Sequence, residues 1–338
     1  STTISAGTLQ VGMGGLAGSL GALSAAVINN GALIFNRSDA FTYTGAFSGT
    51  GNLTVATGGL TLNGGASYSG ATVLSATATP TSISYNFNVP PNTSGFSGKG
   101  TVSIAPAANS TFTSAFTANY SFANTLTGVT LGSSSNTQGI TLASNIDITG
   151  PIAVYGGSIT QNAGVSVTSG GSNITYTAAG GGFTSADDRA IYIGATSGAR
   201  SVINAGGGSI TLSGSWGTTS TAGGNDSATW IFGSDIKTSG AGAINITGDA
   251  TNTTTTSSAY GVNLGNGTVI QTETGALNIT GTGGKAYMQQ YEHNRYQPGR
   301  GQAAFITGNF IEHKANVLKW LKYGIGENGN GVALESNG

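Results

Sequence analysis

The chain has 338 residues, of which 58 are glycine, 7% are charged and none is cysteine. Its formal net charge of -1 argues against a nucleic-acid-binding protein, because such proteins carry a basic face that neutralises phosphates. The lack of cysteine excludes a disulfide framework and thiolate metal sites, and no stretch approaches the roughly 18 consecutive apolar residues of a membrane-spanning helix.

A short phrase of alternating residues returns along the chain. It consists of a glycine, usually a small or polar residue, and two aliphatic residues on either side of one polar residue. It occurs at residues 7–11, 51–55, 59–62, 208–212, 242–246 and 275–279. Such alternation predicts a strand with one buried face, and the glycine indicates the turn before it. Because the segments between these strands lack a helical pattern, the sequence predicts an all-β chain of stacked coils, a β-solenoid.

Residues 1–85 carry one kind of repeat. Residues 1–9 match residues 68–76, and further related phrases lie at 29–39 and 43–51. These phrases resemble the passenger-associated repeat of autotransporter passenger domains, the secreted β-helical parts of Gram-negative surface proteins. The resemblance implies a right-handed parallel β-helix outside the cell. Because the first residues resemble the second half of a repeat, we expect the chain to be a piece of a longer polypeptide.

Residues 86–150 are less regular than the residues before them. The pair Pro90 and Pro91 predicts a loop that leaves the stack, because proline cannot donate to a strand ladder. An aromatic-rich run follows at Phe112, Phe116, Tyr120 and Phe122. The segment is either an insertion that offers a partner-binding surface or a set of irregular rungs with an aromatic core.

Residues 151–284 carry a longer repeat. Equivalent places are occupied by Ile174, Ile210, Ile244 and Leu277, at spacings of 36, 34 and 33 residues. This pattern resembles the haemagglutinin-type repeats of very large bacterial adhesins. At about 20 residues per coil, one repeat is expected to supply one and a half to two coils.

Residues 285–338 break the pattern, because charged residues gather there together with His293 and His313. Apolar residues at helical spacing predict one short helix over residues 309–323. We expect this tail to cap the solenoid or to be an insertion before the solenoid resumes. The two histidines have no ligand cluster beside them in the sequence, so we predict no metal site and no cofactor.

An acidic pair, Asp187 and Asp188, precedes Arg189 at the start of a predicted strand. Glycoside hydrolysis requires two carboxyl groups across a cleft, and lyase chemistry requires clustered carboxylates with a basic residue. Turns before strands also favour aspartate, so we expect a solvated turn and a protein that is not an enzyme. These three residues form the site of the alternative, a polysaccharide-active β-helix enzyme.

Three aromatic residues, Tyr192, Trp230 and Tyr260, share one position when the repeats are aligned. On an open face of the solenoid they would form a ladder on which sugar rings stack, as in a polysaccharide-binding protein. If the ladder is buried, the same residues belong to the core.

The two resemblances imply a structural or adhesive segment that is extracellular or on the outer cell surface, as a stalk, a fibre or part of a biofilm matrix. The expected partners are molecules on host or neighbouring cells, or matrix polysaccharide, contacted at sites repeated along the rod. Flat threonine-rich faces and uncovered coils would also allow a homo-oligomer or filament.

Overall fold

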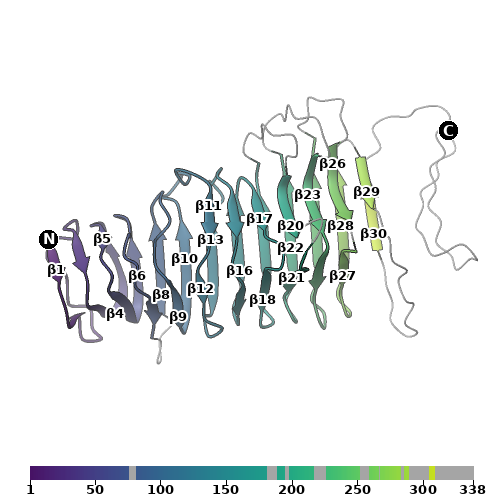
Figure 1. The fold of residues 1–338 in the computed structure, drawn as a ribbon. Coiled ribbons are helices and arrows are strands. Elements are labelled where there is room, and N and C mark those ends of the chain that lie inside the picture. Colours follow the sequence, from purple (N-terminus) through teal and green to yellow (C-terminus); the bar gives the residue numbers. More distant parts are fainter. Residues whose placement is uncertain are drawn as a thin grey trace, which may run out of the picture.

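The computed structural model describes residues 1–75, 81–180, 189–194, 198–216, 226–251, 259–265, 267–282, 285–288 and 304–308. Within them every regular element is a β-strand, and the strands stack into a rod from β1 (Thr2–Ile4) to β30 (Ala304–Gly308) (Figure 1). All strand pairings in this part of the chain are parallel. The predicted all-β parallel solenoid is confirmed. The helix expected over residues 309–323 lies outside the described residues, which include no helix with the length and hydropathy to cross a membrane.

The rod has three faces, and each coil passes through them in turn. The long sheet supplies the first face and part of the third. Strands β4 (Ala32–Tyr43) and β6 (Asn52–Leu62) run from the third face to the first, because the start of β6 pairs with β7 (Thr72–Leu74) and its end pairs with β8 (Thr81–Asn86). The first face comprises the ends of β4 (Ala32–Tyr43) and β6 (Asn52–Leu62), then β8 (Thr81–Asn86), β10 (Gly100–Ala105), β13 (Gly128–Gly132), β16 (Ile152–Gly156), β19 (Ile174–Ala178), β22 (Ile210–Ser215), β25 (Ile244–Asp249), β28 (Leu277–Thr282) and β30.

The other two faces are formed by shorter strands. The second face comprises a sheet of β1, β3 (Val27–Asn29) and β5 (Phe47–Ser48), then a sheet of β11 (Phe116–Ala118), β14 (Ile140–Leu142), β17 (Ile159–Gln161), β20 (Arg189–Gly194), β23 (Asp226–Phe232), β26 (Ala259–Gly265) and β29 (Lys285–Met288). The third face comprises β2 (Thr8–Val11), the starts of β4 and β6, then β7 (Thr72–Leu74), β9 (Gly95–Gly98), β12 (Ser121–Phe122), β15 (Ile146–Ile148), β18 (Ser166–Ser169), β21 (Ser201–Asn204), β24 (Ser234–Lys237) and β27 (Val269–Gln271).

An aliphatic column fills the interior behind the first face. It consists of Ile83, Val102, Val129, Ile152, Ile174, Ile210 and Ile244, each buried and each paired with the next, followed by the partly buried Leu277. The predicted equivalence of Ile174, Ile210, Ile244 and Leu277 is therefore confirmed. Full burial of one such side chain contributes about 1.5–3 kcal/mol to the stability of the fold. Stacking also pairs the strand edges that a single coil would expose.

The number of residues per coil changes along the rod. On the first face, Ile152 pairs with Ile174, whereas Ile174 pairs with Ile210, 36 residues further on. One long repeat therefore makes one coil, in contrast to the one and a half to two coils expected from the sequence. The additional residues lie in sequence between the first-face strand and the second-face strand of each coil. With about 4.8 Å between neighbouring coils, the described coils form a rod roughly 50 Å long.

The glycine that begins the repeated phrase is required by close contact between coils. A Cβ atom on Gly242 would lie 2.3 Å from the carbonyl oxygen of Gly208, and one on Gly275 would lie 2.0 Å from that of Gly242. The same arrangement occurs in the first repeats, where a Cβ atom on Gly51 would lie 2.1 Å from the carbonyl oxygen of Gly31. None of these glycines has a positive φ. The corner therefore selects glycine for its lack of a side chain, since backbone packs directly on backbone there.

Residues 86–150 form rungs of the same rod. The prolines lie between β8 and β9, and the backbone nitrogen of Asn92 donates to the carbonyl oxygen of Ala66, 3.3 Å away in the preceding coil. The loop thus stays in the stack, unlike the expected loop that leaves it. The aromatic run points into the core, where Phe112, Phe116, Tyr120 and Phe122 are all buried.

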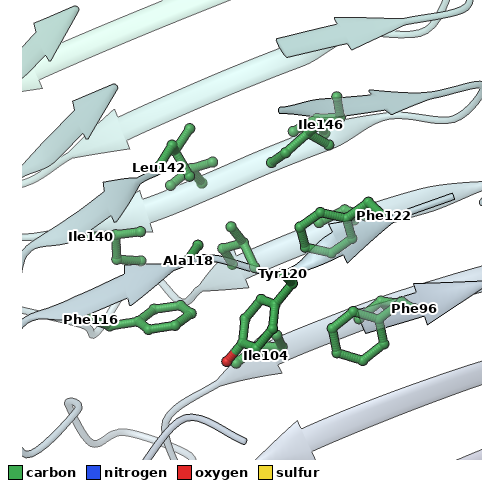
Figure 2. Packing of buried hydrophobic residues seen from close by; sticks show 14 of the residues in the cluster. Phe96, Ile104, Phe116, Ala118, Tyr120, Phe122, Ile140, Leu142 and Ile146 are labelled. Carbon is green, nitrogen blue, oxygen red and sulfur yellow. The ribbon is translucent and has the colours of Figure 1, made fainter. Parts of the chain in front are cut away.

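Large rings from successive coils pack together in this part of the core. Figure 2 shows Tyr120 between Phe116 and Phe96, and its ring centroid lies 6.0 Å and 5.4 Å from theirs. Phe96 also stacks on Phe122 at 5.6 Å. These ring contacts stabilise the fold in addition to the burial of apolar surface. Offset and edge-to-face aromatic pairs contribute roughly 0.5–1.5 kcal/mol beyond the burial term.

Buried tyrosine hydroxyls form a network beside the aromatic rungs. Tyr68 lies 2.6 Å from the hydroxyl of Thr72 and also bonds the hydroxyl of Tyr85, and Thr72 lies 3.1 Å from Tyr85. Thr93 extends the network, because its hydroxyl lies 3.3 Å from that of Thr72 and donates to the carbonyl oxygen of Gly70 at 2.6 Å. Each hydroxyl has a partner, as burial of a polar group requires.

Burial of these tyrosines predicts loss of stability at alkaline pH. Burial raises the pKa of Tyr68 to about 12 and also raises the pKa values of Tyr85, Tyr120 and Tyr176 above the usual tyrosine value. The fold therefore favours the protonated hydroxyls. Their contribution to the free energy of unfolding is complete below about pH 10 and is lost as the pH rises toward the pKa values of the folded state.

The measurement is an ultraviolet titration of tyrosine ionisation with circular dichroism in parallel. We expect a fraction of the 12 tyrosines to ionise only as the strand signal disappears above about pH 10. Ionisation of all of them near the ordinary tyrosine pKa, with the strand signal unchanged, would contradict the expectation.

Candidate binding surfaces

The residues of the predicted alternative enzyme site are only partly described. Asp187 and Asp188 lie outside the described residues, whereas Arg189 begins β20. The Arg189 guanidinium carbon lies 3.7 Å from the centroid of the Trp230 ring and 4.4 Å from that of Tyr192. This cation–π arrangement gives Arg189 a packing role on the outside of the second face.

The predicted aromatic ladder is shorter than the sequence alignment indicates. Tyr192 pairs with Trp230, and their rings meet edge to face at 6.1 Å. Tyr260 pairs with Ser227, and the residue beside Trp230 is Asn263, so the alignment of Tyr260 with the other two was wrong. To place Tyr260 beside Trp230, β26 would have to shift by three residues, which would turn Val262 and Leu264 outward. The burial of these two side chains therefore fixes the observed register.

Exposure of the two aligned aromatic residues also limits their use as a platform. Trp230 is 7% exposed and is covered by Arg189, whereas Tyr192 is half-buried. Trp230 therefore belongs to a packed cluster, which also includes Phe232 at 5.2 Å. Arg189 also lies over the Tyr192 ring, so a sugar could meet only the part of this ring that Arg189 leaves exposed, and Trp230 offers no free face.

A groove of about 370 Å³ interrupts the second face. It lies where the segment around Pro91 replaces a strand between the sheet that ends at β5 and the sheet that begins at β11. Its lining consists of Pro90, Pro91, Asn92, Thr93, Ala115, Phe116, Thr117, Asn119 and Tyr120. The Tyr120 hydroxyl donates to the carbonyl oxygen of Pro91 at 2.7 Å and joins the two walls.

The groove has an apolar floor and a polar, uncharged rim. Phe116 and Tyr120 are buried, whereas Asn92, Thr117 and Asn119 are exposed. The Asn119 side-chain oxygen accepts from the hydroxyl of Ser144 at 2.6 Å, which fixes one side of the rim. Hydroxyl and amide groups around prolines and aromatic rings suit an uncharged polar ligand. The sequence signal for this groove is the proline pair, which removes two ladder donors from one rung.

A charged cluster lies on the third face. The Asp235 carboxylate accepts from Arg200 Nε at 3.1 Å and from Lys237 Nζ at 3.3 Å. Burial raises the pKa of Asp235, but hydrogen bonds from the two cations outweigh it and hold the pKa below its usual value. Such surface ion pairs contribute about 0–1 kcal/mol to stability. Because the charges of this cluster are paired with one another, we assign it no binding role.

Potential metal ligands do not gather in the part of the chain that the structure describes. There, no group of three histidine, aspartate or glutamate side chains is close enough to hold an ion. His293 and His313 lie outside this part.

Stacked coils with parallel ladders on three faces, continuous on the first and divided into two sheets on each of the others, define the class of protein as a parallel β-solenoid. The chain is 55% identical over 53 residues to Adhesin BmaC autotransporter of Brucella suis biovar 1 (strain 1330), a match that covers 16% of this chain and 2% of that protein. The chain thus spans only a small part of the length of the curated relative it matches. No family model and no solved structure matches the chain. The parallel solenoid and this similarity fit an autotransporter passenger domain, which confirms the predicted resemblance.

Proposed function

We propose that the chain is a non-enzymatic, adhesive segment of a bacterial surface protein, displayed outside the cell. The observation that carries the proposal is the unbroken first-face ladder from β4 to β30, which forms a stiff rod with the same outward positions in every coil. The similarity to an autotransporter adhesin supports this assignment. A rod of this kind holds contact sites away from the cell and repeats them along its length.

The outward positions of the first face are uncharged over many coils. One such column consists of Ser84, Ser103, Thr130, Ala153, Thr175, Thr211, Asn245 and Asn278. Like charges at this spacing would repel, whereas hydroxyl and amide groups can contact many polar surfaces. The proposed partners are molecules on host or neighbouring cells, or matrix polysaccharide, with weak contacts summed by avidity.

Beads coated with the purified chain test this proposal. We expect them to adhere to cultured epithelial cells or to bacterial lawns more strongly than beads coated with the heat-unfolded chain, and to lose adhesion when free folded chain is added in excess. Equal adhesion by folded and unfolded protein would contradict it. We also propose that uncovered coils and flat threonine-rich faces allow the rods to join into filaments. Electron microscopy of the same preparation tests this, because rods about 50 Å long that stay separate would contradict it.

A further inference from the structure

An uncharged track runs along the second face from the groove. Strand register places Thr117 beside Thr141, Thr141 beside Thr160, and Thr160 beside Tyr192. Each of these residues lies between two buried neighbours on its strand, so its side chain points outward. Thr117 is also part of the groove rim. The groove and the column of threonines therefore form one continuous surface that ends at a half-buried aromatic ring.

The backbone of Thr117 adds hydrogen-bonding groups to this surface. The Phe116 nitrogen donates to Gly139, and the Ala118 oxygen accepts from Ala143, so both residues use their backbone groups toward β14. Because successive residues of a strand alternate in direction, the N–H and C=O of Thr117 point toward the groove. Strand β11 has β14 as its single ladder partner among the described strands, which leaves this edge open to a ligand.

We propose that the groove and the track from Thr117 to Tyr192 bind a neutral, linear glycan. One sugar would occupy the groove against the proline rings, and the following sugars would lie over Thr141 and Thr160 toward the ring of Tyr192. This inference deepens the proposed adhesive function and rests on it, because it names the chemical class of one partner.

The chemistry of the track favours this occupant. A glycan offers hydroxyl donors and acceptors to the threonine hydroxyls, to the Asn119 amide and to the open Thr117 backbone groups. The step between coils, about 4.8 Å, is close to the length of one sugar residue in an extended β-1,4-linked chain. Successive coils can therefore meet successive sugars. At the end of the track, the part of the Tyr192 ring that Arg189 leaves exposed supplies an aromatic surface of the kind on which sugar rings pack.

Charge and edge length argue against two other occupants. Neither the groove lining nor the threonine column includes a cation, so an acidic glycan would find no counter-charge before Arg189, whose guanidinium carbon lies 4.4 Å from the Tyr192 ring centroid at the far end of the track. An extended peptide would need a longer free edge, because β11 has three residues and only Thr117 directs its backbone toward the groove. The proline wall opposite offers no N–H groups at Pro90 and Pro91.

Titration calorimetry of the purified chain with defined hexasaccharides tests the proposal. The probes are cellohexaose and chitohexaose as neutral glycans, hexagalacturonate as an acidic glycan, and an uncharged hexapeptide rich in threonine and valine. We expect at least one neutral hexasaccharide to bind with an affinity that is independent of sodium chloride concentration, and the acidic glycan and the peptide to show no binding. Absence of binding by both neutral probes, or binding of the peptide alone, would overturn the proposal.

Three variants locate the binding on the molecule. Thr141→Lys places a long cation in the middle of the track, and Ala115→Trp fills the groove. Each is expected to weaken neutral-glycan binding by about tenfold or more, because contacts are lost and the ligand carries no charge to pair with the lysine. Thr168→Lys is the matched control, since Thr168 is an outward threonine in the ladder of the third face, away from both the track and the first-face column. Its effect should stay within about twofold.

The outcomes separate this inference from the broader function. Equal weakening by Thr141→Lys and Thr168→Lys, with circular dichroism unchanged in both, would place glycan binding elsewhere and overturn the assigned track. If coated beads adhere to cells while neither neutral hexasaccharide binds, the adhesive function stands and the glycan site fails. If a neutral hexasaccharide binds at the track while the beads do not adhere, the site stands and the adhesive function fails.

Discussion

The Gly242→Ala substitution is expected to lower the free energy of unfolding by about 3 kcal/mol, the upper part of the range for overpacking. The added methyl group would lie 2.3 Å from the carbonyl oxygen of Gly208 and 3.0 Å from Cβ of Thr238. A flexible side chain could rotate away, but the main obstacle is the backbone of the preceding coil. Relief of the clash therefore has to separate two coils and weaken the ladder hydrogen bonds between β22 and β25.

A second glycine from the same part of the rod provides the control for this substitution. Gly207 has no positive φ, and a Cβ atom there would meet no heavy atom within 4 Å. Gly207→Ala should therefore change stability by less than about 0.5 kcal/mol. Thermal and urea unfolding followed by circular dichroism measure both variants. Equal midpoints for Gly242→Ala and Gly207→Ala would show that the corner yields without cost and that the steric explanation is wrong.

Phe96→Ala is expected to destabilise the rod by about 3–5 kcal/mol, the usual cost of removing a buried phenylalanine ring. Phe96 is 2% exposed and contacts one ring of its own coil and one of the next, with centroids 5.9 Å from Tyr85 and 5.6 Å from Phe122. The cavity would lie between coils whose backbones are fixed by parallel pairing on either side, so collapse around it is limited.

Local effects distinguish this substitution from general loss of hydrophobicity. Val89→Ala is the control, because Val89 is 59% exposed in the same region and should contribute less than about 0.5 kcal/mol. Hydrogen exchange should show faster opening at β7, β9 and β12 in Phe96→Ala, with β22 and β25 close to the parent chain, because each coil contacts its neighbours alone. Uniformly faster exchange along the rod would contradict a nearest-neighbour description.

The alternation of apolar residues carried enough information to predict the class of fold and part of its register. Ile210-Thr211-Leu212 and Ile244-Asn245-Ile246 have the same alternation of inward and outward residues, which we call parity. A glycine stands before each at the same distance, and the structure pairs the two segments residue by residue. The parity of a strand is set by burial, which depends on residue type and can be read from the sequence.

The length of a coil could not be predicted from the same pattern. A repeat of 36 residues is compatible with one long coil or with more than one short coil, since periodicity counts residues and not turns of the rod. Tyr260 illustrates a related error, because alignment by a shared alanine and aromatic residue ignored parity. The side chains of Val262 and Leu264 decide that register through their burial.

The groove could be predicted only in part. Pro90 and Pro91 indicated an interruption in the ladder, but their neighbours across the groove come from β11, more than one strand later in the chain. Spatial proximity of Asn92 and Asn119 depends on how many coils separate them, and that number required the register of the whole region. The threonine track depends on the same register, because Thr117, Thr141 and Thr160 have unequal sequence spacings.

The unequal coil lengths have a consequence for how such a rod can change its reach. Every ladder contact joins a coil to the one directly before or after it, so removal of residues 174–209 would bring Ile152 beside Ile210 with an aliphatic residue again on an aliphatic residue. Gain or loss of a whole coil alters the distance spanned by about 4.8 Å and leaves the remaining contacts unchanged in kind. Reach and stability per coil are thus separable properties, and gene duplication can tune the first without redesign of the second.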